Sequence, residues 1–150
     1  MIGIGYDSHR FADGAKLVLG GVEIDHPRGL EGHSDADVVT HAVIDAILGA
    51  GGSGDIGTLF PPDEAQWRGA DSIDLLRTAI GTIAGRVVNV DVSVICEAPK
   101  LAPHKGAMEA LLGEVTSARV SVKATTNEGM GWIGRGEGIA AIAVAQIDDD

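Results

Sequence analysis

An aspartate and two histidines have the residue types and spacing of a metal site. Asp7 and His9 are two residues apart, directly after residues 2–6, which have the pattern of a short strand. Side chains two apart in an extended segment point to the same face, so a carboxylate and an imidazole would lie together. His41 as a third ligand would complete an Asp-His-His set with one open position, which is typical of catalytic zinc. Cys96 is the only cysteine, which disfavours a structural, thiolate-rich zinc site.

His41 lies on a polar stripe of a helix predicted over residues 34–49. Asp37, His41 and Asp45 are four residues apart and therefore stack along one side of that helix. One interpretation is an exposed polar face, but the remaining positions are nearly all apolar or small. We therefore expect the stripe to be directed at a site, with Asp37 or Asp45 orienting the His41 ring.

A glycine-rich segment near the C-terminus could bind an anion. Thr125-Thr126-Asn127-Glu128 follows a predicted strand, and Arg135 stands among the glycines from Gly129 to Gly138. Hydroxyls, backbone N–H groups and a guanidinium bind phosphate, and Glu128 beside them could hold a magnesium-type ion. The alternative is a glycine-rich hairpin with Arg135 in a structural ion pair, and composition does not decide between the two.

Two further segments could contact a phosphorylated ligand. His33 precedes the helix, where the dipole disfavours protonation, and it could donate a hydrogen bond to a phosphoryl oxygen. A lone histidine at such a position is more often a capping or core residue. Ala98-Pro99-Lys100-Leu101 could offer backbone groups and a cation to a base or phosphate, or could simply be the exit from a strand.

These residues are positioned by one α/β (α+β) domain spanning residues 1–150, in which one mixed sheet carries helices on one face. Ser34 or Asp35 is the expected cap of the first helix and Asp71 that of the second. The segment from Gly49 to Asp71 should be a long loop, which is often a functional lid. The apolar strand 139–147 should be central or lie at a subunit interface. The other predicted elements are strands at 2–6, 17–19, 22–24, 88–94 and 120–124, and helices at 34–49, 72–83 and 104–112.

The overall charge limits the ligands. A formal net charge of −11 argues against nucleic acid or an anionic membrane as a partner. A small phosphorylated ligand would have to be met by metal ions, backbone N–H groups and a few cations. The single cysteine, the absence of a signal-like start and the lack of a long apolar run predict a cytoplasmic protein.

Short motifs follow one another along the whole chain. They are Gly5-Tyr-Asp7-Ser-His9, Gly20-Gly21, Gly32-His33-Ser34-Asp35-Ala-Asp37, His41-Ala, Asp45-Ala, Gly54-Asp55-Ile-Gly57, Leu59-Phe-Pro61, Gly69-Ala-Asp-Ser72, Ala98-Pro-Lys100, Pro103-His104, Lys123-Ala-Thr-Thr126 and Gly134-Arg-Gly-Glu-Gly-Ile139. Their order and spacing resemble those of the 2-C-methyl-D-erythritol 2,4-cyclodiphosphate synthase family.

The resemblance implies a reaction and an assembly. The family converts 4-diphosphocytidyl-2-C-methyl-D-erythritol 2-phosphate to the 2,4-cyclodiphosphate and CMP, in non-mevalonate isoprenoid synthesis. It implies zinc at each active site, Mg²⁺ or Mn²⁺ with the diphosphate, and a homotrimer with active sites between subunits. Rival hypotheses are a zinc phosphohydrolase acting on a nucleotide diphosphate and a non-catalytic metal-binding protein that kept the fold.

The resemblance also implies residue roles. Asp7, His9 and His41 match zinc ligands, Glu128 matches the ligand of the second metal, and His33 and Thr126 match positions that stabilise the transition state. Many relatives carry Asp-x-Asp after Phe-Pro where this chain has Pro62-Asp63-Glu64, which leaves open whether Asp63 or Glu64 contacts substrate. The implied substrate contacts are Asp7, Ser8, His9, His33, Ser34, Asp55, Ile56, Gly57, Phe60, Pro61, Pro62, Asp63, Glu64, Cys96, Glu97, Ala98, Pro99, Lys100, Leu101, Ala102, Thr125, Thr126, Asn127, Glu128, Trp132 and Arg135.

Overall fold

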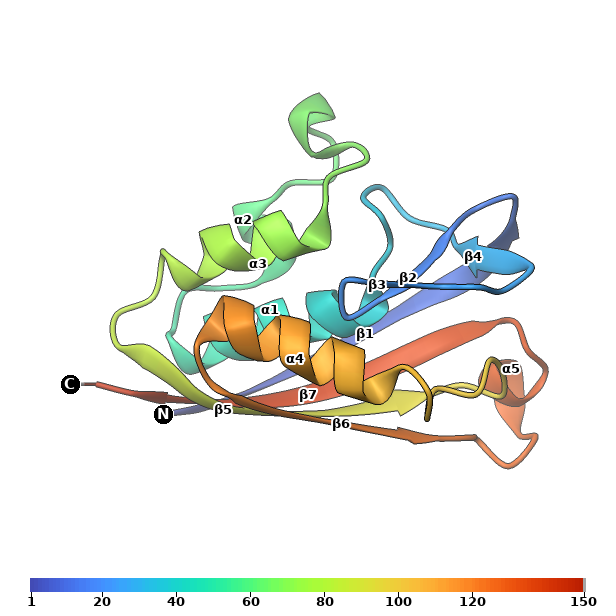
Figure 1. Cartoon of the computed structure of the whole chain (residues 1–150). Helices are drawn as coiled ribbons and strands as arrows, with labels where there is room; N and C mark the ends of the chain where they lie inside the picture. The colour runs from blue at the N-terminus through green and yellow to red at the C-terminus, as the bar shows by residue number, and fades with distance from the viewer. Residues whose placement is uncertain (150) are drawn as a thin grey trace.

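A mixed sheet of five strands, in the order β4-β1-β7-β5-β6, carries the longer helices on one face (Figure 1). The computed structural model describes residues 1–149. Strands β5 and β6 are parallel and the other neighbours antiparallel, which confirms the predicted mixed α+β sheet. The strands are β1 (Ile2–Asp13), β4 (Arg28–Leu30), β5 (Arg86–Ile95), β6 (Arg119–Thr125) and β7 (Gly138–Asp148), and β2 (Leu17–Leu19) and β3 (Val22–Ile24) form the separate predicted hairpin.

Strand β7 is the centre of the sheet. It pairs with β1 on one side and β5 on the other, so the prediction of a central strand is confirmed. Its residues 139, 141, 143, 145 and 147 are all buried on the face that carries the helices. Three of these five are alanines, so helices can approach the middle of the sheet closely.

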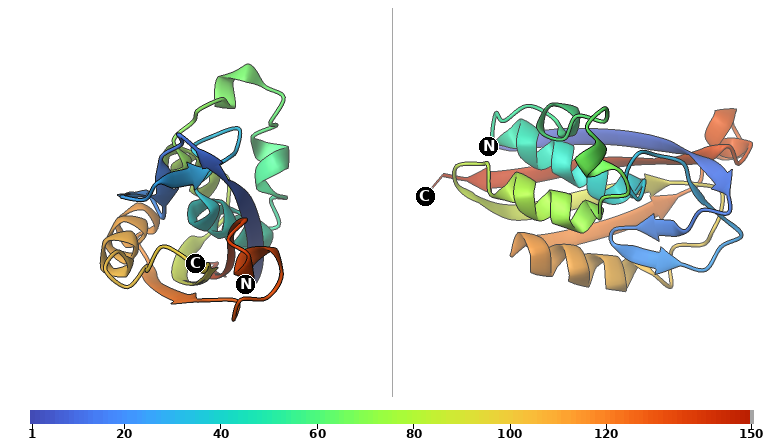
Figure 2. Two further views of the ribbon diagram at one scale, coloured as in Figure 1. Left: turned by 90° about the vertical axis from the view of Figure 1, so that its right-hand side faces the viewer. Right: turned by 90° about the horizontal axis from the view of Figure 1, so that it is seen from above.

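The helices differ from the predicted ones mainly at their ends. Seen from above, α1, α3 and α4 lie side by side across the sheet (Figure 2). The predicted loop 49–71 contains two short helices, and α5 and β4 were not predicted. No helix of residues 1–149 combines the length and apolar composition needed to cross a membrane. The helices are α1 (Val38–Ala50), α2 (Ile56–Leu59), the 3-10 helix η1 (Ala65–Trp67), α3 (Ser72–Ile80), α4 (Lys105–Thr116) and α5 (Gly131–Gly134).

The predicted cap of the first helix was wrong, whereas that of the second is confirmed. Asp37 caps α1 by accepting a hydrogen bond from the Thr40 N–H at 3.0 Å, and neither Ser34 nor Asp35 does so. The chain cannot be helical before Asp37, because Ala36 has a φ of 57°, in the left-handed region. Asp71 caps α3 as expected.

Helix α1 is the buried helix of the fold, since all its residues except Asp45 and Gly49 are buried. It lies against β1 at backbone distance. A Cβ on Gly5 would stand 2.0 Å from the Ala42 carbonyl oxygen, and one on Gly3 would stand 2.1 Å from that of Ala46. Glycine is therefore required at both positions.

We expect Gly5→Ala to lower the free energy of unfolding by at least about 3 kcal/mol, because the new methyl group overlaps helix backbone that cannot move aside. Urea unfolding measures the change. Gly106→Ala is the matched control: Gly106 is exposed in α4 with open space around it, so the change should be neutral or stabilising by up to about 1 kcal/mol. Equal stabilities of the two variants would contradict the close packing of α1 on β1.

Candidate metal centre and adjoining cavities

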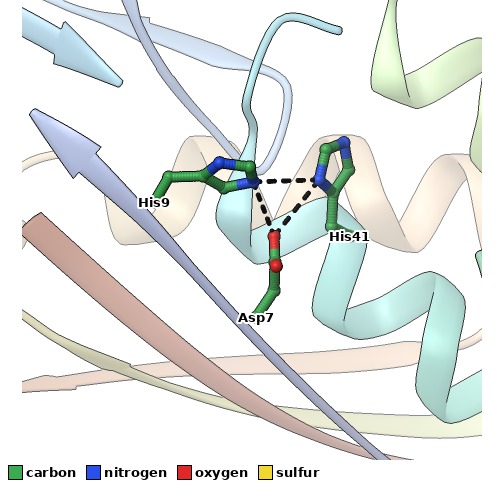
Figure 3. Close-up of side chains that lie close together, drawn as sticks. All are labelled: Asp7, His9 and His41. Carbon is green, nitrogen blue, oxygen red and sulfur yellow. Dashed lines mark hydrogen bonds and ion pairs between the residues drawn. The ribbon is translucent and has the colours of Figure 1, made fainter. Parts of the chain in front are cut away.

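Three ligating atoms converge where β1 passes the start of α1 (Figure 3). The Asp7 Oδ2 atom lies 2.8 Å from His9 Nε2 and 3.2 Å from His41 Nδ1, and the two ring nitrogens are 3.3 Å apart. In a tetrahedral zinc site with bonds of about 2.0–2.1 Å, ligand atoms are separated by about 3.3 Å. The triangle therefore has nearly the size of one face of such a site. Among residues 1–149, this is the one cluster of three or more potential metal ligands.

The strand supplies two ligands because it continues past Tyr6 as predicted. β1 runs to Asp13, and alternation places Asp7 and His9 on the same face as Gly3 and Gly5, toward α1. The other ring nitrogen of His9, Nδ1, donates to the Glu31 carbonyl oxygen at 2.9 Å. Because a carbonyl only accepts, the neutral His9 ring carries its proton on Nδ1 and presents the Nε2 lone pair to the cluster.

The expected role of Asp37 and Asp45 was wrong, because neither carboxylate is hydrogen-bonded to the His41 ring within residues 1–149. The fully buried Asp37 accepts from the N–H groups of Gly20 and Gly21 at 2.8 and 2.7 Å, besides capping α1. Asp45 accepts from the Ile56 N–H at 2.7 Å. Both carboxylates therefore hold backbone segments around His41 rather than its ring.

The His41 ring is held instead by two serines. Its Nε2 atom lies 2.8 Å from Ser72 Oγ and 3.1 Å from Ser34 Oγ. Ser34 was predicted as a site residue, whereas Ser72 was predicted only as the start of a helix. Ser72 ends the Gly69-Ala-Asp-Ser72 motif, but its position there is also that of an ordinary first helical residue.

Charge and burial act in opposite directions within the cluster. Burial raises the pKa of Asp7, but hydrogen bonds and charge interactions with His41 and His9 outweigh it and hold the pKa at about 2. Burial lowers the pKa of His9, but the hydrogen bond and charge of Asp7 raise it above the ordinary value. Without a metal, the cluster thus favours an ionised Asp7 beside a protonated His9, and a bound cation would take the place of that proton.

A cavity of about 220 Å³ adjoins the cluster, and we call it the metal-side cavity. His33 lines it, and His33 Nε2 is buried without a hydrogen-bond partner in residues 1–149. Asp55, Pro61, Asp63 and Glu64 lie outside the lining, and the Asp55 carboxylate caps α2 instead. Trp67 was missed by sequence reasoning; it packs edge-on against Phe60 with ring centroids 4.9 Å apart. The lining residues are His9, His33, Ser34, His41, Ile56, Gly57, Phe60, Pro62, Trp67 and Leu75.

A second cavity, of about 240 Å³, lies between the ends of β5 and β6, and we call it the threonine-side cavity. Its lining combines residues of the predicted 96–102 and 125–126 segments. His33 and Thr126, which were expected to act on the same transition state, therefore line different cavities of one chain. Lys105 is a cation that sequence reasoning missed. Burial raises the pKa of the Cys96 thiol to about 11, so this cysteine is no nucleophile. The lining is Cys96, Glu97, Pro99, Lys100, Leu101, Ala102, Lys105, Ala124, Thr125 and Thr126.

The loop after Thr126 is fixed by its backbone. Glu97 accepts from the N–H groups of Asn127 and Gly129 at 2.9 and 3.2 Å. Glu128, between them, has a φ of 55° and an exposed side chain. Neither Ala98, Asn127 nor Glu128 is part of the cavity lining.

The last predicted contacts line neither of these two cavities. Trp132 and Ser8 line a third cavity of about 210 Å³, together with His9, Arg10 and Glu137. Arg135 Nε donates to Glu137 Oε2 at 2.7 Å, which is the ion pair foreseen as the alternative to phosphate binding.

A family model described as the YgbB family matches residues 1–148, and the chain belongs to this family. It is 58% identical to the 2-C-methyl-D-erythritol 2,4-cyclodiphosphate synthase of Symbiobacterium thermophilum, over 98% of both chains. It is also 56% identical to the bifunctional enzyme IspD/IspF of Novosphingobium aromaticivorans, of which it spans 39%. A solved structure of 2C-methyl-D-erythritol-2,4-cyclodiphosphate synthase in a CDP-bound form matches with a TM-score of 0.88 and 35% identity, covering 99% of this chain and 100% of the other.

The pKa shifts predict how stability depends on pH in the metal-free protein. The interactions that depress the pKa of Asp7 stabilise the folded protein fully above pH 3.8, the ordinary carboxylate value. This stabilisation is lost as the pH falls toward 2. The raised pKa of His9 stabilises it below the ordinary value of 6.5, and this is lost as pH rises through the raised pKa. Asp7→Asn should therefore cost roughly 1–2 kcal/mol between these ordinary values and less on either side.

The measurement is urea unfolding of the wild-type protein and Asp7→Asn, with chelator present, at pH values below, within and above the interval from 3.8 to 6.5. Asp74→Asn is the control, since Asp74 pairs with Arg77 on the exposed side of α3. The coupling of Asp7 to the histidines would be refuted by a stability difference independent of pH.

Proposed function

We propose that this protein is a metal-dependent cyclase. It would convert 4-diphosphocytidyl-2-C-methyl-D-erythritol 2-phosphate to 2-C-methyl-D-erythritol 2,4-cyclodiphosphate and CMP, in isoprenoid biosynthesis. The observation that carries the proposal is the triangle of Asp7, His9 and His41 beside the metal-side cavity, in a chain of this family.

The donor set fits zinc. Two neutral imidazoles and one carboxylate are borderline ligands that zinc accepts, and their separations of 2.8–3.3 Å need little adjustment to surround one ion. When bound, zinc would act as a Lewis acid that withdraws charge from a phosphoryl oxygen. Because the ligands must be deprotonated, zinc binding should strengthen as pH rises through the raised pKa of His9.

The reaction needs no nucleophile from the protein. An oxygen of the substrate's 2-phosphate attacks the β-phosphorus, the bond from the β-phosphorus to the bridging oxygen breaks, and CMP leaves with the bonding electrons. The protein therefore acts by positioning and by stabilising charge. The unpartnered His33 Nε2 is suited to donate a hydrogen bond to a phosphoryl oxygen. The Thr126 Oγ1 accepts from the Glu128 N–H at 3.2 Å, which leaves the hydroxyl proton to donate.

The two ends of the substrate would occupy different cavities. The methylerythritol phosphate fits the metal-side cavity, with the Asp55–Gly57 and Phe60–Glu64 segments around it. The cytidine and diphosphate fit the threonine-side cavity, where Lys100 and Lys105 supply positive charge and Glu128 would hold Mg²⁺ or Mn²⁺. The similarity to a CDP-bound structure supports this assignment. Ser8, Trp132 and Arg135 would make further contacts.

We assign the complete active site to a homotrimer, with one cavity from each of two adjacent subunits. In a single chain the two cavities share no lining residue. The sheet face without helices carries an apolar patch, which we call the β1–β7 patch. Its residues Ile4 and Tyr6 stand opposite Val144 and Ile142 in the strand register. Such a patch is typical of an interface between subunits. The exposed fractions are 74% for Ile2, 70% for Ile4, 57% for Tyr6 and 39% for both Ile142 and Val144.

The proposal also includes a cellular location and a class of ligand. The single buried Cys96 fits a reducing compartment, so a cytoplasmic location is part of the proposal. The negative net charge of −11 and the small cavities favour a small-molecule substrate over nucleic acid or a membrane surface.

Product analysis by mass spectrometry tests the reaction. With zinc and magnesium, the wild-type protein should convert the cytidine substrate to CMP and the cyclic diphosphate. His41→Ala should lose bound zinc and activity, whereas His33→Ala should keep zinc and lose roughly 100-fold or more in turnover.

The outcomes separate the rival functions. Linear phosphate products without cyclic diphosphate would establish a zinc phosphohydrolase instead. Intact substrate after long incubation of a zinc-loaded protein would establish a non-catalytic metal-binding protein. Stoichiometric zinc in His41→Ala would refute the ligand set.

The β1–β7 patch predicts the effect of a charge on assembly. Ile4→Asp should convert a trimer to monomers, because the patch would have to bury an unpaired carboxylate. Light scattering coupled to gel filtration measures the mass, and circular dichroism checks the fold. Ala110→Asp, which adds the same charge on the exposed side of α4, should remain trimeric. A monomeric wild-type protein would overturn the assignment of the site to two subunits.

A further inference from the structure

A series of hydrogen bonds leads from His41 away from the other two candidate metal ligands, Asp7 and His9. His41 Nε2 lies 2.8 Å from Ser72 Oγ, and the Ser72 hydroxyl contacts Asp35 Oδ1. The Ser72 N–H donates to the other Asp35 oxygen at 3.0 Å. Ser72 is fully buried as the first residue of α3, and Asp35 lies in the loop before α1. Neither residue is a metal ligand or part of the metal-side cavity lining.

The Asp35 carboxylate determines which atom donates in each of these hydrogen bonds. An ionised carboxylate only accepts hydrogen bonds, and Asp35 accepts them from the backbone N–H groups of Asp37 and Ser72 as well. The single hydroxyl proton of Ser72 must therefore point at Asp35. The Ser72 oxygen is then left with lone pairs toward His41, so the bond at 2.8 Å requires a proton on His41 Nε2.

A competing arrangement exists for the same ring. Ser34 Oγ lies 3.1 Å from His41 Nε2, and its hydroxyl could donate to that nitrogen. His41 Nδ1 would then carry the proton and donate to Asp7 Oδ2, 3.2 Å away. In that tautomer the nitrogen that faces Asp7 and His9 has no lone pair for a metal.

We propose that Asp35 and Ser72 are positioning residues that hold His41 in the tautomer protonated on Nε2. The Nδ1 lone pair then points at Asp7 and His9 before any metal arrives. The consequence for metal affinity rests on the proposed function. His9 achieves the same end with the Glu31 carbonyl, so each histidine of the cluster has its outer nitrogen assigned to an acceptor.

The tautomer can be read directly in the metal-free protein. Long-range ¹H–¹⁵N NMR correlations at alkaline pH, where imidazole is neutral, distinguish protonation at Nε2 from protonation at Nδ1. We expect the Nε2–H tautomer for His41 in the wild-type protein and a shift toward Nδ1–H in Ser72→Ala. Ser121→Ala, on the sheet face without helices, should leave the signals unchanged. A wild-type His41 protonated on Nδ1 would overturn the proposal.

Zinc affinity gives a second readout, measured by chelator competition. Ser72→Ala should bind zinc roughly 10- to 100-fold more weakly, the range typical for loss of a residue that orients a metal-binding histidine. Ser72→Thr keeps the hydroxyl and should retain the wild-type tautomer and affinity. Should Ser72→Ala not fold, Asp35→Asn keeps Ser72 but replaces the carboxylate, which only accepts hydrogen bonds, by an amide. This variant should shift the His41 tautomer and the zinc affinity in the same direction as Ser72→Ala.

The outcomes separate this inference from the proposed function. An unchanged tautomer and unchanged zinc affinity in both Ser72→Ala and Asp35→Asn would overturn the positioning role. Asp74→Asn, which removes another carboxylate from the first turn of α3, controls for charge. A wild-type protein that binds no zinc would contradict the proposed metal site alone, because the tautomer is measured without metal.

Discussion

Helix α1 can lie against strand β1 at backbone distance because positions 3 and 5 carry no side chain. The helix side of this contact is Ala42, Ala46 and Ala50, whose backbone atoms occupy the space that a strand Cβ would need. Strand alternation then places the next two residues on this face, Asp7 and His9, beyond the glycines. His41 stands beside Ala42 at the same end of the helix. The metal cluster is therefore a continuation of the closest packing contact in the fold, and its ligand spacing is set by backbone rather than by flexible side chains.

This origin is compatible with phosphate binding by an acidic chain, which the proposed function requires. Asp7 is the one carboxylate in the cluster, and the two histidines, not a lysine or arginine, hold its pKa at about 2. Histidines are compatible with either charge state, so the same three groups form a stable cluster without a metal and a ligand set with one. Under the proposed function, the positive charge for the substrate comes mainly from metals, which the net charge of −11 does not oppose.

The features predictable from sequence were those that repeat locally. Strand alternation identified β5 and β6, an apolar run identified β7, the glycine pair identified the β2–β3 hairpin, and residue types with their spacing identified Asp7, His9 and His41. The start of α1 was mispredicted because the choice among three polar residues depends on Gly20 and Gly21, whose N–H groups also need Asp37. Ser72, Trp67 and Lys105 escaped prediction for a related reason. Their roles come from packing between segments distant in sequence, and their local patterns are ordinary.

The polar residues along one side of α1 show how contacts between segments distant in sequence organise the site. Asp37, His41 and Asp45 lie on one side of the helix, as their spacing predicts, but they serve three different segments. Asp37 holds the β2–β3 hairpin, Asp45 holds the start of α2, and His41 faces the cluster between them. Burial raises the pKa of both aspartates, and the backbone N–H donors they hold counteract it. Breaking either contact would remove backbone N–H donors from a carboxylate that burial already disfavours, so each segment is tied to the helix that carries His41. A single helix face therefore carries His41 and also holds helix α2, whose residues Ile56 and Gly57 line the metal-side cavity.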